Sequence, residues 1–369
     1  MATPMLRALR RAYPQSELVG IMSPIVQEVI EGAWGDDERP WFDEYILFRK
    51  GRRKLNAAHR AQGVTSRRGI IRQLRQLRVD VALLTTNSWW TAAVSRFGGV
   101  RKVVGYDRDS RRYLLHEPLP VPKSENGDYA PISAVDYYLA LASWVGGDTE
   151  RSDARSMQLR ASDADLQLAD KLWHSVGFRG EVPTVVVNSN SAKDSARVWP
   201  ESHVIELTKR LVHERDVQVL LHCGPGERES ANRIAASVDH PSVASMGHTE
   251  NLPIGLSRGV LKRAAVVVST DSGARHMAVA LDRPVVSLFG PTSSAWTRTY
   301  NTPELELAED LDCRACYQSE CPLKHHACMQ NLSVNRVMDA VASRLGEASY
   351  KKGHLIADAT ESEPAVRVA

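Results

Sequence analysis

The stretch 269–294, STDSGARHMAVALDRPVVSLFGPTSS, decides the fold, because it changes from strand to helix and back to strand without a long loop. The β-branched run that leads into it predicts a buried strand over 265–269. The apolar residues 274–281 predict a short helix, which Arg283-Pro284 ends. A second β-branched run predicts a strand over 285–289. This succession is typical of a parallel α/β sheet.

The turn between the first strand and the helix has the residue types of an anion-binding site. Asp271 or Ser272 is suited to the N-cap position, and Gly273 allows a ligand to approach the backbone closely. The first-turn N–H groups have no partner within the helix and lie at the positive end of its dipole, where phosphates bind. His276 follows Ser272 by four residues, so it lies on the same side of the helix.

Asp271 indicates that the anion also carries hydroxyl groups. A carboxylate repels a bare phosphate, but it accepts hydrogen bonds from sugar hydroxyls. The turn therefore predicts a sugar attached to a diphosphate, with Asp271 on the sugar and Ser272, Gly273 and His276 on the phosphates. The alternative is an ordinary N-cap beside a histidine that binds nothing.

The same alternation of strands and helices extends outward on both sides of this stretch. Further strands are predicted over 18–22, 79–84, 101–105, 184–188 and 217–223, and helices over 201–214, 229–238 and 333–345. We therefore expect an α/β fold of two Rossmann-like, doubly wound domains. Ligands of such sheets bind at the carboxyl ends of the strands.

The chain of 369 residues is long enough for two domains. The stretch from about 146 to 163 is polar and acidic and has no apolar periodicity, so the boundary is expected there. We predict an N-terminal domain over 1–155, a C-terminal domain over 156–348 and a polar tail over 349–369 that has too few apolar residues to fold alone.

The positive charge of the chain is concentrated in one block. The net charge is only +3, but residues 49–78 contain eleven Lys or Arg and no Asp or Glu. Such a block suits a phosphate-bearing partner, an anionic membrane surface or nucleic acid, and the alternative is a solvated helix face. No apolar run is long enough to span a membrane and no signal pattern opens the chain, so we expect a cytoplasmic protein.

Four of the five cysteines are grouped as C-x2-C-x4-C-x6-C. In a reducing compartment this spacing suggests a structural metal more than disulfides, and free packed thiols are the third interpretation. The spacing departs from a standard zinc knuckle. The group comprises Cys313, Cys316, Cys321 and Cys328, with His325 and His326 as further potential ligands.

The quoted stretch resembles the signature of glycosyltransferase family 9, the ADP-heptose:lipopolysaccharide heptosyltransferases: an aspartate, a serine or threonine and a glycine, a histidine three residues on, and a closing F-G-P-[ST]. The segments "VDVALLTTNSWWTAAVSRFGGVRKVVGY", "ARVWP", "GPGERES" and "CRACYQSECPLKHHACM" are similar to the family too, most of all to its second heptosyltransferase.

The resemblance implies a GT-B architecture, in which two Rossmann-like domains face a cleft, the C-terminal domain binds the donor and the N-terminal domain binds the acceptor. The implied reaction is inverting transfer of heptose from ADP-L-glycero-D-manno-heptose to the phosphorylated inner core of lipopolysaccharide. It implies no metal and no cofactor. The implied location is the cytoplasm, with peripheral contact at the anionic face of the inner membrane, and no nucleic acid is an expected partner.

The resemblance also assigns roles to single residues. Asp271 matches the family's aspartate on the donor sugar, and Ser272, Gly273 and His276 match the diphosphate contacts. The remaining donor-binding residues lie in three other loops. They are Ser191, Lys193 and Arg197 in "NSNSAKDSARVWP", Glu229 or the nearby Glu227 for the ribose hydroxyls, and Met246 with Gly247 for the adenine.

The amino end departs from the family pattern. Family members begin with a strand and a Gly-Asp loop, whose aspartate serves as general base, and "MATPMLRALRR" matches the helix that follows this loop. No catalytic base is therefore assigned, and the interpretation favoured is a true start upstream of Met1. The alternatives are a non-catalytic nucleotide-sugar binding protein and a related transferase that uses another nucleotide sugar.

Overall fold

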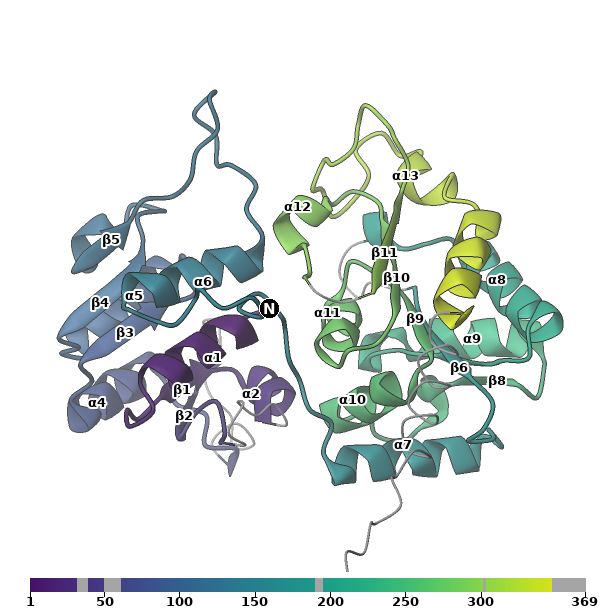
Figure 1. The fold of residues 1–369 in the computed structure, drawn as a ribbon, viewed down its shortest axis with the longest axis horizontal. Coiled ribbons are helices and arrows are strands. Elements are labelled where there is room, and N and C mark those ends of the chain that lie inside the picture. Colours follow the sequence, from purple (N-terminus) through teal and green to yellow (C-terminus); the bar gives the residue numbers. More distant parts are fainter. Residues whose placement is uncertain (32–38, 50–60, 190–194, 301–302, 347–369) are drawn as a thin grey trace, which may run out of the picture. The chain divides into compact units, whose positions relative to one another are not determined.

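The computed structural model describes residues 1–31, 39–49, 61–189, 195–300 and 303–346. The chain forms two compact units (Figure 1). One contains Met1–Arg160 and the later segment Ser294–Asn301, which includes α12 (Ser294–Thr297), and the other contains Ala161–Ser293 and the chain from Thr302 onward. The α12 segment thus belongs to the N-terminal unit although it follows much of the C-terminal unit in the sequence. A single domain boundary therefore does not separate the two units. Within that unit, Ser133 Oγ donates to the carbonyl of Arg298 at 3.0 Å.

The C-terminal unit contains one parallel sheet of six strands in the order β11-β10-β9-β6-β7-β8. Numbered from its own first strand, this is the order 6-5-4-1-2-3 of a Rossmann fold, as predicted. Its strands are β6 (Thr184–Asn188), β7 (Gln218–Leu221), β8 (Val243–Ser245), β9 (Val266–Thr270), β10 (Val285–Phe289) and β11 (Glu304–Ala308). The strands β6, β7, β9 and β10 are buried along their whole length, because their β-branched and aliphatic runs have helices on both faces.

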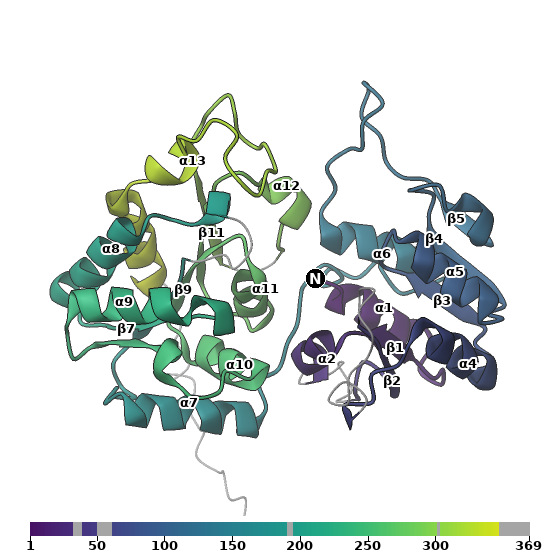
Figure 2. The same ribbon diagram turned by 180° about the vertical axis from the view of Figure 1, so that it is seen from behind.

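The helices of this unit form two groups. Helices α8 and α9 pack against each other, and α10 packs against both α7 and α11. Figures 1 and 2 show α7 and α10 side by side from opposite directions. Their bounds are α7 (Asp163–Ser175), α8 (Glu201–Glu214), α9 (Arg228–Val238), α10 (Ile254–Arg263), α11 (Gly273–Ala280) and α13 (Ala327–Gln330), with short 3-10 turns η2 (Ser195–Arg197), η3 (Pro225–Glu227) and η4 (Met246–His248). Residues 334–346 are helical as well.

The N-terminal unit is also α/β with parallel strands, but its strands form two sheets. One pairs β1 (Val19–Met22) with β2 (Glu44–Leu47), and the other has the order β3-β4-β5. The second sheet comprises β3 (Val81–Leu84), β4 (Lys102–Tyr106) and β5 (Glu117–Leu119). Among the described residues β1 and β3 do not pair, so the parallel strands of this Rossmann-like unit are divided between two sheets.

Both sheets of the N-terminal unit contribute to one hydrophobic core. Ile46 of β2, Leu84 of β3 and Val103 of β4 belong to a single buried cluster with residues of α4 and α5. The helices of the unit are α1 (Thr3–Ala12), α2 (Pro24–Glu31), α4 (Arg67–Leu77), α5 (Trp89–Phe97), η1 (Arg112–Leu114) and α6 (Ala134–Trp144). In neither unit is a described helix both long and apolar enough to cross a membrane.

Candidate functional site

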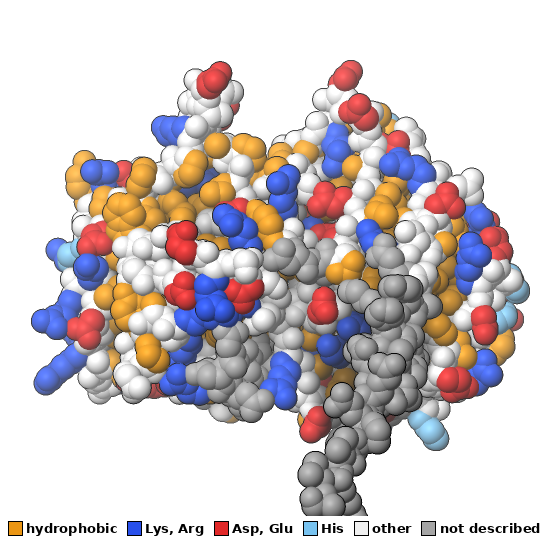
Figure 3. Space-filling view, in the orientation of Figure 1, with side chains coloured by type: hydrophobic (Ala, Val, Ile, Leu, Met, Phe, Trp, Pro, Cys, Tyr) orange, Lys and Arg blue, Asp and Glu red, His pale blue; other side chains and the backbone are white. Residues whose placement is uncertain are grey.

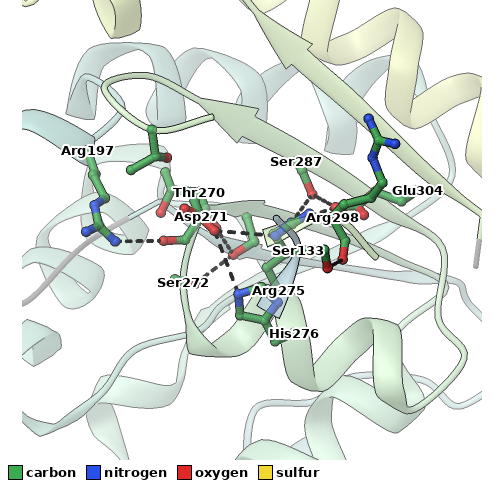
Figure 4. Close-up of polar contacts among 12 residues, drawn as sticks. Ser133, Arg197, Thr270, Asp271, Ser272, Arg275, His276, Ser287, Arg298 and Glu304 are labelled. Carbon is green, nitrogen blue, oxygen red and sulfur yellow. Dashed lines mark hydrogen bonds and ion pairs between the residues drawn. The ribbon is translucent and has the colours of Figure 1, made fainter. Parts of the chain in front are cut away.

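The predicted anion-binding turn lies where the carboxyl end of β9 meets α11 (Figure 4). Ser272 is the N-cap of α11 and has extended backbone angles. Its side chain accepts no hydrogen bond from the helix, so it leaves the first-turn N–H groups uncapped. A Cβ added to the exposed Gly273 would meet no heavy atom within 4 Å. The turn therefore combines an open backbone with the positive end of a helix dipole.

Arg197 is brought to this turn from the loop that follows β6. Its Nη1 donates to the backbone carbonyl of Asp271 at 3.2 Å. The completely buried Trp199 anchors the same loop, because its Nε1 donates to the carbonyl of Leu332 at 3.0 Å. The predicted residues Ser191 and Lys193 lie outside the described residues.

The carboxylate of Asp271 is mostly buried and engaged in an ion pair. Its Oδ1 lies 3.3 Å from Nη1 of Arg275, which has no exposed surface. Arg275 Nε also donates to Glu304 Oε1 at 2.6 Å and to Ser287 Oγ at 3.1 Å. A cation without access to water requires such partners. Arg275 thus faces Oδ1 of this carboxylate.

Neither Arg275 nor Glu304 was predicted from the sequence. Arg275 was detectable, since it lies among apolar residues of α11 and four residues after Asp271, an interval that places two side chains together on a helix. Glu304 lies at the start of β11, 29 residues further along the chain. Only the sheet order β11-β10-β9 brings it to Arg275.

His276 is neutral, and its contact with Asp271 is therefore no ion pair. Burial, reinforced by the charge of Arg275, lowers the pKa of His276 well below the usual 6.5. Its Nε2 lies 3.7 Å from Asp271 Oδ1, and its buried Nδ1 has no hydrogen-bond partner among the described residues. An imidazole in this state serves an anion as a hydrogen-bond donor and not as a cation.

The remaining predicted donor-binding residues differ in accessibility. Glu229 is exposed in the first turn of α9, whereas Glu227 Oε2 accepts from the backbone N–H of Gly224 at 2.7 Å. Glu227 is thus engaged by the backbone of its own turn, and the exposed Glu229 is the carboxylate more accessible to a ligand. Met246 is completely buried, so its side chain presents no surface to a ligand in this structure, and the predicted adenine contact stays a prediction. Only the backbone around Met246 and Gly247 is left for that role.

The four clustered cysteines do not form a metal site in this structure. All are free thiols, and the described residues contain no group of three or more His, Cys, Asp or Glu side chains that could hold a metal ion. The possibility of a metal at Cys313, Cys316, Cys321 and Cys328 gains no support. His325 Nδ1 instead accepts from the backbone N–H of Ala327 at 2.9 Å.

A Rossmann-ordered sheet with an uncapped helix N-terminus at the carboxyl ends of its strands is typical of proteins that bind nucleotides or other phosphate-bearing ligands. The family comparison identifies the kind of protein more closely. This chain belongs to glycosyltransferase family 9 (heptosyltransferase), whose family model matches residues 67–327, and it is therefore a glycosyltransferase.

Curated relatives and solved structures agree with this membership. The chain is 26% identical to lipopolysaccharide heptosyltransferase 2 of Salmonella typhimurium over 94% of this chain and 95% of the relative. It is 28% identical to the Escherichia coli K12 protein of the same name over 80% of each chain. Its fold is similar to that of E. coli ADP-heptose lps heptosyltransferase II, with a TM-score of 0.70, 21% identity and coverage of 94% and 95%. A family 9 structure from Veillonella parvula gives a TM-score of 0.71 at 17% identity, with coverage of 94% and 93%.

Proposed function

We propose that this glycosyltransferase transfers heptose from ADP-L-glycero-D-manno-heptose to the lipopolysaccharide inner core, with inversion and without a metal. The observation that carries the proposal is the open turn between β9 and α11, where uncapped N–H groups, Arg197, Asp271 and His276 converge. The names of the two curated relatives support the choice of heptose and of lipopolysaccharide.

The turn supplies a means of stabilising the leaving group. In an inverting transfer an acceptor hydroxyl attacks the anomeric carbon, the bond from that carbon to the diphosphate oxygen breaks, and ADP leaves with the electron pair. The N–H groups of Gly273 and the next residues, the neutral His276 and the guanidinium of Arg197 all present donors where this charge develops. Asp271 Oδ2 is assigned to the sugar hydroxyls. The base that takes the acceptor proton is unassigned.

We further propose that the N-terminal unit contacts the phosphorylated acceptor at an anionic membrane face. The described part of the basic block includes five exposed arginines on or next to α4, which are Arg67, Arg68, Arg72, Arg75 and Arg78. Beside them α5 exposes Trp89, Trp90 and Phe97. Arg67 lies over the Trp90 ring at 4.3 Å, and Arg75 Nη2 donates to the carbonyl of Phe97 at 2.9 Å. Figure 3 shows blue side chains projecting at the margin where α4 lies.

Exposed arginines next to exposed tryptophans are accommodated better at a lipid surface than in bulk water. Tryptophan prefers the boundary between apolar chains and headgroups, and long cationic side chains reach the phosphates from there. Each Lys or Arg near an anionic bilayer contributes roughly 1 kcal/mol to binding.

Calorimetric titration with ADP-heptose, ADP-glucose and UDP-N-acetylglucosamine tests the donor assignment. We expect ADP-heptose to bind most tightly, and comparable affinities for all three would remove the assignment. Asp271→Asn is expected to reduce the preference for ADP-heptose over ADP, whereas His276→Ala is expected to weaken ADP itself. Product formation on a core-truncated lipopolysaccharide separates the transferase from a protein that only binds the donor.

Co-sedimentation with vesicles tests the membrane contact. We expect binding to vesicles that contain anionic phospholipid, little binding to neutral vesicles, and a marked loss of binding in the Trp89→Ala/Trp90→Ala variant. Tyr317→Ala serves as the matched control, because Tyr317 is an equally exposed aromatic residue in the C-terminal unit. Equal binding by both variants would refute the assignment of this surface.

A further inference from the structure

A chain of polar side chains crosses the carboxyl ends of three adjacent strands and ends at the N-cap of α11. We call it the His222–Asn188 chain. His222 follows β7, and its Nδ1 lies 3.1 Å from Oδ1 of Asn188, the last residue of β6. Asn188 Nδ2 donates to Ser272 Oγ at 3.0 Å and to Ser269 Oγ at 3.3 Å. His222 Nε2 lies 3.1 Å from Ser257 Oγ of α10. The chain thus connects α10 to the predicted donor turn.

The direction of each hydrogen bond in this chain follows from its chemistry. Burial lowers the pKa of His222 to about 4, so the imidazole is neutral at physiological pH and has one N–H. Because the amide nitrogen of Asn188 faces the two serines, its Oδ1 must accept from His222 Nδ1. His222 Nε2 then accepts from the hydroxyl of Ser257.

The directions of the hydrogen bonds made by the Ser272 hydroxyl follow from the single hydrogen of each serine. Ser269 Oγ donates to the carbonyl of Thr270 at 2.9 Å, so in its 3.0 Å contact with Ser272 it must act as the acceptor. Ser272 therefore donates to Ser269 and accepts from Asn188. Both interactions hold its hydroxyl on the side of β6 and β9.

This arrangement is unusual for a serine at an N-cap. Such a serine normally accepts from the N–H of the second or third helical residue and so satisfies one of the unpaired donors. Ser272 does not, so the N–H groups at the start of α11 stay open. Two polar atoms beside them, Thr270 Oγ1 and His276 Nδ1, are buried without a hydrogen-bond partner among the described residues, as expected where a ligand completes the site.

We propose that Asn188 and His222 are positioning residues, which hold the Ser272 hydroxyl away from α11 and thereby keep its first-turn N–H groups available to the diphosphate of the donor. The proposal rests on the proposed function of this turn. It assigns the two residues no contact with the donor, so their effect passes entirely through Ser272.

A double-mutant cycle tests this dependence on Ser272. In Asn188→Ala the Ser272 hydroxyl keeps only its contact with Ser269, so its rotation to cap α11 becomes easier. ADP must then displace that cap, which should weaken ADP binding roughly five- to tenfold. In the Ser272→Ala background no hydroxyl exists to form the cap, so Asn188→Ala should have little further effect on ADP affinity. The same loss in both backgrounds would mean that Asn188 only supports the local fold, and would overturn the proposal.

His222 provides a second test. In His222→Asn the amide nitrogen occupies the position of Nδ1 and keeps the donor to Asn188, so ADP affinity should be close to that of the wild type. His222→Leu removes the donor and should weaken ADP as Asn188→Ala does. Equal affinities of His222→Asn and His222→Leu would contradict the assigned role.

Hydrogen exchange without ligand distinguishes a failure of this inference from a failure of the proposed function. Amides in peptides covering 271–276 should exchange more slowly in Asn188→Ala than in the wild type, because the rotated hydroxyl protects one of them. Unchanged exchange in this segment would overturn the inference. Slower exchange in a protein that does not bind ADP would uphold the inference and reject the donor site.

Discussion

Arg275 is the buried cation beside the turn between β9 and α11, and it has no exposed surface. It lies between Asp271 and Glu304, whose side chains are also buried, and its Cζ lies 4.8 Å from the centroid of the Phe289 ring. Because Asp271 is predicted to bind the donor sugar, the buried pair orients a residue of the site as well as stabilising the unit.

Arg275→Met should be strongly destabilising, because it leaves two buried carboxylates without their cation. Breaking one partner of a buried ion pair typically costs about 3–5 kcal/mol. Urea unfolding measures this loss. The triple variant Arg275→Met/Asp271→Asn/Glu304→Gln, which removes all three charges, should recover most of it. A loss below about 1 kcal/mol for Arg275→Met would contradict the central role of this arginine.

The lowered pKa values of His222 and His276 predict a loss of stability in mild acid. The pKa of His222 is lowered to about 4 by burial, and that of His276 lies well below 6.5. As the pH falls from about 6.5 towards 4, the unfolded chain takes up protons at these residues and the folded chain does not, so unfolding becomes more favourable. Above pH 6.5 this contribution is constant.

Urea unfolding at pH 7.5, 5.5 and 4.5 measures this effect. We expect His222 to contribute roughly 2 kcal/mol to the loss by pH 4.5. His222→Asn, which cannot titrate in this range, should show a correspondingly smaller loss. The same pH dependence in both proteins would exclude His222 as a source.

At the scale of elements, α7 and α10 are joined by a buried ion pair between Asp165 and Arg258. Arg258 Nε and Nη2 donate to the two carboxylate oxygens at 2.9 and 3.2 Å. Asp165 also completes a capping box at the start of α7, where it accepts from the backbone N–H of Ser162 and Ser162 Oγ accepts from that of Asp165. One side chain thus starts a helix and fixes its packing partner.

Asp165→Ala should therefore lower the stability of the C-terminal unit by about 3–5 kcal/mol, since it removes the cap and leaves Arg258 buried without its carboxylate. Ser162→Ala removes only the cap and should cost about 1 kcal/mol. Urea unfolding of the two variants measures both losses of stability, and we expect the loss in Asp165→Ala to be several times larger. Similar losses in both would show that the ion pair adds little.

At the scale of the whole molecule, the two units have different predicted ligands. Since the predicted donor-binding turn lies in the C-terminal unit, ADP at 100 times its dissociation constant should stabilise that unit by about 2.7 kcal/mol. Hydrogen exchange with and without ADP should show protection around 270–276 and 195–199. Protection confined to peptides of the N-terminal unit would contradict the assignment of the donor to the C-terminal unit.

The sequence alone determined the C-terminal fold and the turn at which the donor site is predicted. The predicted bounds of β6, β10 and α8 match the structure residue for residue, and the N-cap was predicted at Asp271 or Ser272 and found at Ser272. These features depend on local properties: β-branched runs favour strands, Arg-Pro ends a helix, and small polar residues favour caps. The family signature is equally local, since its fixed points lie within residues 271–292.

Only the tertiary structure decided which distant side chains meet at that site. The contacts of Asn188 with His222 and Ser272, and of Arg275 with Glu304, join residues that lie between 29 and 84 positions apart. The burial of Met246, the return of α12 to the N-terminal unit and the division of that unit into two sheets were likewise unpredicted. The physical reason is that strand order sets these contacts, and strand order follows from how whole elements share a core, which no short window of sequence records.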